Sequence, residues 1–115
     1  MKDYKFELEC ESTTYQLIFN LNVMQEIQEE YGTIEKWGAL TDGKSGETNV
    51  KALIFGLTHM INEATEIKND EEGTNKPLMT TKQVGRLITK IGVEKSTQKL
   101  NEAIVEGTKS EGKNE

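Results

Sequence analysis

The longest helical pattern in the chain covers residues 48–67. Apolar residues recur there at steps of three and four, which draws one stripe along a helix: Val50, Leu53, Ile54, Leu57, Ile61 and Ala64. A second, weaker stripe consists of Ala52, Phe55, Gly56 and His59. Two stripes indicate a helix covered on more than one side, by its own domain or by another chain. We expect the rest of the chain to pack around this helix, whose start Thr48 or Asn49 can cap.

The N-terminal residues alternate between apolar and polar side chains. The apolar positions form two sets separated by a polar break at Ser12 and Thr13: Tyr4, Phe6, Leu8 and Cys10, then Tyr15, Leu17, Phe19 and Leu21. A period of two is typical of a strand with one face in water. The pattern predicts a β-hairpin over residues 4–21. Because a two-stranded ribbon is marginal by itself, its apolar face must lie on helices or join further strands.

Two helices are expected between the hairpin and the long helix. Asn22 is predicted to cap the first, with Gln25 completing a capping box, and Gly32 ends it. Thr33 then caps a short helix over residues 34–40.

Two more helices are expected after residue 67. Residues 68–77 carry charged and polar side chains and predict a solvated loop. Thr80 and Gln83 repeat the capping-box spacing and begin a helix that ends at Gly92, and a last helix covers about residues 94–106.

These elements predict an α+β fold in which an N-terminal β-hairpin packs against a bundle of four to five helices. Residues 1–106 form a single domain in this interpretation, because 115 residues are enough for one modest core. Residues 107–115 have no apolar side chain to bury and predict a disordered C-terminal tail.

Composition narrows the classes of partner. Charged residues make up 30% of the chain and the formal net charge is −6. An acidic chain lacks the basic face that binds nucleic-acid phosphates or anionic membranes, so neither is expected as a partner. Cys10 is the only cysteine, which excludes an internal disulfide and is typical of a reducing compartment. Without a signal-peptide pattern or an apolar run of about 20 residues, the chain is predicted to be cytoplasmic.

Residues 38–45 match G-x-x-x-x-G-K-[ST], the pattern of a phosphate-binding loop, with Gly43, Lys44 and Ser45 at the positions that would hold a nucleotide. That chemistry needs a buried strand directly before the loop and a helix starting at its Lys-Ser end. Residues 31–37 instead have the pattern of two helices, and the next helical pattern starts several residues after Ser45. We interpret the match as a coincidence and keep nucleotide binding as the weaker alternative.

Other side chains that could do chemistry are isolated. His59 is the only histidine, and Glu63 one turn away suggests a surface pair rather than a catalytic or zinc site. Cys10 is expected to be a small buried side chain, and the acidic run 70–72 lacks the spacing of a calcium loop. We therefore predict no catalytic residue, cofactor or metal, and a non-enzymatic protein that works through contact surfaces.

Three segments carry a family resemblance. They are FNLNVMQEIQEEYG (residues 19–32), LIFGLTH (53–59) and TTKQVGRLI (80–88). Their order after a hairpin resembles the tail assembly chaperones of long-tailed bacteriophages and prophages. The resemblance implies a protein that binds the tape-measure protein, recruits tail-tube subunits and is absent from the finished virion. A structural tail-completion or connector protein is the alternative within the same broad class.

A chaperone of this kind needs apolar area that it can offer to a helical partner. We hypothesise that Trp37, Phe55 and His59 border the partner-binding surface. Trp37 is open to two interpretations, since a lone tryptophan can be a core residue or an interface anchor. The exposed edge of the hairpin could also pair with another copy and give a homo-oligomer.

Overall fold

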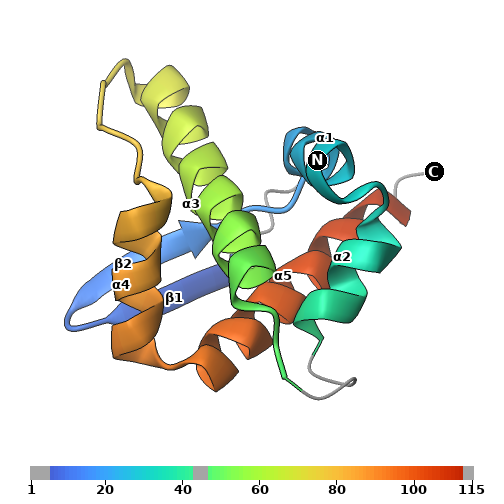
Figure 1. The fold of residues 1–115 in the computed structure, drawn as a ribbon. Coiled ribbons are helices and arrows are strands. Elements are labelled where there is room, and N and C mark those ends of the chain that lie inside the picture. The colour runs from blue at the N-terminus through green and yellow to red at the C-terminus, as the bar shows by residue number, and fades with distance from the viewer. Residues whose placement is uncertain (1–5, 43–46, 113–115) are drawn as a thin grey trace.

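The computed structural model describes residues 6–42 and 47–112, which are mostly helical (Figure 1). In chain order, the two strands and five helices of this part are β1 (Phe6–Cys10), β2 (Thr13–Leu17), α1 (Leu21–Tyr31), α2 (Ile34–Thr41), α3 (Val50–Glu72), α4 (Thr81–Ile91) and α5 (Val93–Gly112). The predicted α+β class fits only loosely, because the two strands are five residues each. Within the described ranges, no helix has both the length and the apolar character needed to cross a bilayer.

The hairpin is antiparallel, with Phe6 opposite Leu17 and Cys10 opposite Thr13. Its two-residue loop, Glu11 and Ser12, has positive φ at both positions (49° and 72°), which is the geometry of a type I′ turn. This turn matches the right-handed twist of the two strands. The sequence did not predict it, because neither residue is the glycine or asparagine that such turns prefer.

The hairpin ends earlier than the predicted residue 21. Leu17, Ile18 and Phe19 are all buried, so the alternation stops after the second strand. Leu21, which the alternation placed on the inward face, is 66% exposed. Three consecutive buried side chains cannot lie on one face of a strand, and the chain turns here into α1.

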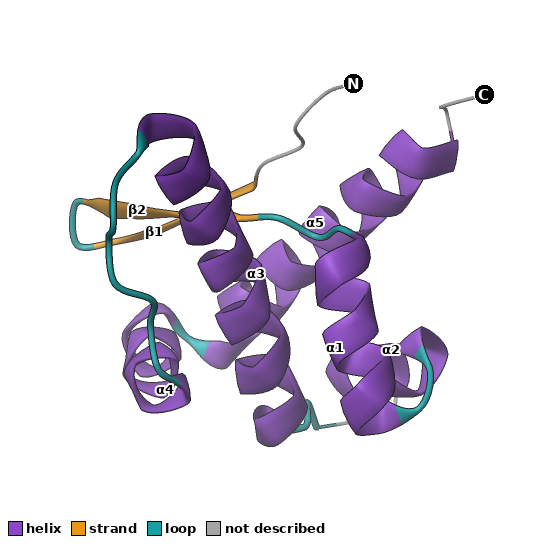
Figure 2. Ribbon diagram, turned by 90° about the horizontal axis from the view of Figure 1, so that it is seen from above, coloured by secondary structure: helices purple, strands orange, loops and turns teal. Residues whose placement is uncertain are grey.

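Helix α3 lies at the centre of the fold and contacts β2 and every other helix (Figures 1 and 2). The expectation that the chain packs around this segment is confirmed. Figure 2 shows α1 and α2 on one side of α3 and α4 on the other. The buried residues of α3 include members of both predicted stripes, together with Thr58 and Met60, which belong to neither: Ala52, Leu53, Gly56, Leu57, Thr58, Met60, Ile61 and Ala64.

The caps of α2, α3 and α4 lie where the sequence placed them. Thr33 caps α2, Asn49 accepts a hydrogen bond from the Ala52 N–H, and Thr80 with Gln83 forms the complete capping box of α4. The predicted cap of α1 is wrong by two residues. Asn20, not Asn22, has the extended backbone of a cap, and its side chain accepts from the Val23 N–H at 3.2 Å.

Helices α3 and α5 are longer than predicted. The expected loop at 68–77 begins only at Gly73, whose left-handed backbone (φ 68°) ends α3. The polar residues before it continue the helix because each added residue gains a hydrogen bond without a new nucleation cost. Likewise α5 runs past the expected end at residue 106 to Gly112. Residues 113–115 of the predicted tail lie outside the described residues.

Two asparagines of α3 hold the loop that leads to α4. The Asn62 side chain donates to the Met79 carbonyl at 2.9 Å and accepts from the Met79 N–H at 2.8 Å. Asn69, two turns further, makes the same pair of bonds with Lys76, both at 3.0 Å. These bonds satisfy the backbone N–H and C=O groups of Met79 and Lys76, which lie in a loop and take no part in the backbone bonding of a helix or sheet. The loop is therefore held along α3.

Candidate functional site

Trp37 is a core residue. Its side chain is fully buried, and its indole Nε1 donates to the Ala52 carbonyl of α3 at 3.0 Å. The hypothesis that Trp37 borders a binding surface therefore fails, because a side chain with no exposed area cannot contact a partner. The sequence left two interpretations of Trp37 open, a core residue or an interface anchor, and the core residue is the correct one.

Gly56 explains how the indole comes so close to α3. A Cβ added at Gly56 would lie 2.4 Å from Cζ2 of Trp37 and 3.1 Å from Cδ1 of Leu100. Only a residue without a side chain lets α2 and α5 pack against the α3 backbone at this point. The glycine of the LIFGLTH segment is thus explained by packing.

Phe55 and His59, the other two proposed contact residues, are half-buried neighbours on α3. Their ring centroids are 4.5 Å apart, and Tyr31 of α1 meets Phe55 edge-on at 5.5 Å. The three rings form a row, which we call the aromatic row, across the α1–α3 contact. The sequence did not place Tyr31 beside Phe55.

The Tyr31 hydroxyl is buried, and no described residue gives it a hydrogen bond. Burial raises the pKa of Tyr31 above its usual value of 10.0, and the nearby Glu30 carboxylate raises it further. The phenol therefore stays neutral at physiological pH and contributes apolar surface to the row.

At His59 the aromatic row meets a hollow of about 340 Å³ between α1 and α3. Its lining, which we call the acidic hollow, includes three glutamates, no lysine and no arginine: Asn22, Val23, Gln25, Glu26, His59, Asn62, Glu63, Glu66 and Leu78. Glu63 is held in place by Asn20 and Asn22, whose amides donate to its Oε2 at 2.8 and 2.9 Å. Leu78 is 44% exposed and adds apolar area at the rim.

The two helices that flank this face run in opposite directions. Asn20 and Asn22 at the start of α1 reach Glu63 near the middle of α3, while Glu30 at the end of α1 pairs with Lys51 near the start of α3 at 3.9 Å. The aromatic row and the acidic hollow therefore follow one another along a single α1–α3 face. Such a face can hold an elongated partner that has apolar and basic side chains.

The remaining residues considered for chemistry do not come together. Gly38 and Thr41 belong to α2, so a helix and not a strand precedes the phosphate-loop match, while Lys44 and Ser45 lie outside the described residues. Cys10 is a half-buried free cysteine beside the core. In the described part of the chain no three histidine, cysteine or acidic residues are grouped so that they could hold a metal.

Comparison of the chain with models of protein families, with curated proteins and with solved structures found no match. The site is therefore argued from its own geometry. Sequence reasoning found Phe55 and His59, and named Glu63 beside His59, but missed Glu26 and Glu66. Glu26 and Glu66 lie 40 positions apart in the chain, and only the antiparallel contact of α1 and α3 makes them neighbours.

Proposed function

We propose that this chain is a non-enzymatic tail assembly chaperone of a long-tailed bacteriophage or prophage. In this proposal it acts in the cytoplasm of the bacterial host, binds the tape-measure protein and recruits tail-tube subunits. It does so as an α+β domain whose hairpin packs on the helices. The resemblance of residues 19–32, 53–59 and 80–88 to that family supports the proposal.

The observation that carries a binding role is the α1–α3 face. Phe55 and His59 offer half-buried rings, and Glu26 and Glu66 supply negative charge in the hollow that His59 lines. A tape-measure protein is a long helical chain in the family that the sequence resembles, and a helix with one apolar stripe flanked by lysines or arginines would complement this face. The charges would favour encounter and register, and the rings would supply most of the affinity.

The test is copurification of the tagged chain with the tape-measure protein encoded beside it. Replacing Glu26 and Glu66 together by lysine should reduce capture roughly tenfold, because both are exposed charges at the rim of the acidic hollow. Phe55→Ala should reduce capture as well. The matched control is the double variant Glu71→Lys and Glu72→Lys, which changes the net charge equally at the exposed end of α3.

Circular dichroism of each variant separates loss of binding from loss of folding. Full capture by folded variants of the α1–α3 face would remove this face from the proposal. Detection of the chain in purified virions would favour the structural tail-completion or connector protein instead. Calorimetric binding of ATP or GTP with magnesium would support the nucleotide-binding alternative at Gly43, Lys44 and Ser45.

A further inference from the structure

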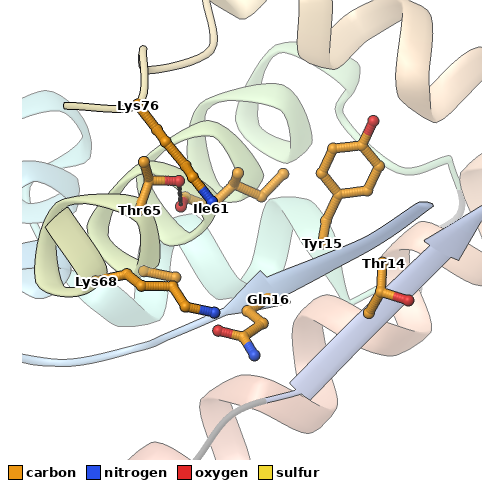
Figure 3. Close-up of a pocket in the computed structure, with 8 residues that line it drawn as sticks. Thr14, Tyr15, Gln16, Ile61, Thr65, Lys68 and Lys76 are labelled. Atoms are coloured by element: carbon orange, nitrogen blue, oxygen red, sulfur yellow. Dashed lines mark hydrogen bonds between the residues drawn. The ribbon is translucent and has the colours of Figure 1, made fainter. Parts of the chain in front are cut away.

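A second hollow, of about 420 Å³, lies between β2 and the far half of α3 (Figure 3). Its lining, which we call the lysine hollow, contains two lysines and no carboxylate: Thr14, Tyr15, Gln16, Ile61, Ala64, Thr65, Lys68 and Lys76. The Lys68 and Lys76 side chains extend into the space between the helix and the strand in Figure 3. In a chain with a net charge of −6, this is a local reversal of sign.

The hollow runs along the outer edge of β2. Thr14, Tyr15 and Gln16 are consecutive, and successive strand residues point to opposite faces, so a space that touches all three lies beside the strand. The partner strand β1 occupies the other edge. On the outer edge, the Ile18 N–H donates to the Met60 carbonyl of α3 at 3.3 Å, so this edge faces α3.

The same edge carries backbone groups that do not bond to β1 in the described hairpin. A two-residue turn makes Cys10 and Thr13 a hydrogen-bonded pair, and pairs alternate along an antiparallel ladder. Thr14 and Gln16 are therefore non-hydrogen-bonded positions relative to β1, and their N–H and C=O groups point outward toward the hollow. An edge of this kind is a template for one more strand.

The backbone of Lys76, on the side of the hollow opposite β2, is held by hydrogen bonds to α3. Asn69 fixes both backbone groups of Lys76 and also accepts from the Thr74 hydroxyl at 2.9 Å. The loop carrying Lys76 therefore has a defined position opposite β2. Ile61 and Ala64 provide an apolar floor between the two lysines and the strand.

We propose that the lysine hollow binds an extended acidic segment of a protein partner as a third strand on β2. Backbone bonds to Thr14 and Gln16 hold the segment, and its carboxylates pair with Lys68 and Lys76. This site is separate from the α1–α3 face and does not rest on the proposed function. It would let the chain hold two partners of opposite charge at once.

The test is fluorescence anisotropy with a fluorescein-labelled peptide of alternating threonine and glutamate. Binding is expected at low salt and should weaken at high salt. The double variant Lys68→Gln and Lys76→Gln should bind roughly threefold to tenfold more weakly, as expected for two exposed ion pairs. The matched control, Lys82→Gln with Lys95→Gln, removes two exposed lysines outside the hollow and should bind as the unaltered chain does.

Strand addition is tested by N-methylation of alternate residues of the same peptide, which removes its N–H donors along one edge and should abolish binding. The proposal would be overturned if the methylated peptide bound as tightly as the unmethylated one. It would also be overturned if the Lys82→Gln, Lys95→Gln control lost as much affinity for the peptide as the Lys68→Gln, Lys76→Gln variant. Displacement by inorganic phosphate alone would overturn it as well, because it would indicate a simple anion site. Self-association that depends on Lys68 and Lys76 would assign the edge to a second copy and overturn the partner proposal.

The Glu26→Lys, Glu66→Lys variant should still bind the peptide, which keeps this test distinct from the capture experiment.

Discussion

A single glycine determines the position of the only tryptophan. The indole of Trp37 lies against Gly56 and donates to the Ala52 carbonyl, and these contacts join α2 to α3. From the sequence, Trp37 could be a core residue or an interface anchor. Which of the two roles Trp37 has depends on whether another helix leaves room for the indole ring. Gly56 of α3 leaves that room, and it lies next to Trp37 only in the folded protein.

Gly56→Ala should therefore destabilise the protein. The new methyl group would meet Cζ2 of Trp37 at 2.4 Å, so the ring or the helix must move. We expect a loss of about 1–3 kcal/mol in the free energy of unfolding, typical of overpacking, measured by urea denaturation and circular dichroism.

Gly38→Ala is the matched control for this change. A Cβ at Gly38, in α2, would meet nothing within 4 Å, so alanine should stabilise the helix by about 0.5–1 kcal/mol. Equal effects of the two substitutions would contradict the packing explanation.

At the scale of elements, the sequence signals for helices were more accurate than those for their ends. The five expected helices are present in the described residues, and the stops at Gly32 and Gly92 are where the sequence placed them. The errors at residues 20–22 and 68–72 have different causes. The alternating strand pattern continues to Leu21, which moves the expected cap from Asn20 to Asn22, and the charged end of α3 has the pattern of a loop because it buries no apolar side chain.

The cap correction leads to a direct comparison of two asparagines. Asn20→Ala should lower the free energy of unfolding by about 1–2 kcal/mol, because it removes the cap of α1 and a bond to Glu63. Asn22→Ala loses only the exposed bond to Glu63 and should cost less than about 0.5 kcal/mol. Thermal or urea denaturation of both variants measures the difference, and the reverse order would restore Asn22 as the cap.

The whole molecule has one hydrophobic core that includes residues of β2 and all five helices of the described part. The largest of its fully buried side chains are Trp37, Leu17, Ile27, Leu53, Leu57, Met60 and Leu100. No element has a separate cluster of its own in this set. A core shared in this way is expected to form and melt as one cooperative unit.

Unfolding followed by Trp37 fluorescence and by circular dichroism should therefore give coincident transitions. Leu100→Ala in α5 should lower both midpoints together, with a loss of about 2–5 kcal/mol from the cavity that it leaves. Val105→Ala, at a 56% exposed position of the same helix, should change the stability by less than about 0.5 kcal/mol. A fluorescence change that precedes the loss of helix would show that α2 detaches separately.

Net charge describes the molecule only on average. The value of −6 correctly describes an acidic chain, yet folding gathers three glutamates at one hollow and two lysines at another. Composition could exclude a broad basic surface. It could not indicate that two sites of opposite sign lie on either side of α3, because the residues of each site come from segments far apart in the chain.

The sequence by itself determined the order of the elements and most caps and stops, because these depend on neighbours within about one or two helical turns. The two apolar stripes of residues 48–67 also indicated that α3 is covered on more than one side. The tertiary structure alone decided that Trp37 is buried and that the outer edge of β2 faces α3. Each of these depends on a contact across the chain: Trp37 with Ala52, and Ile18 with Met60. Periodicity records which side of a helix or strand is apolar, but it does not specify which other segment will cover that side.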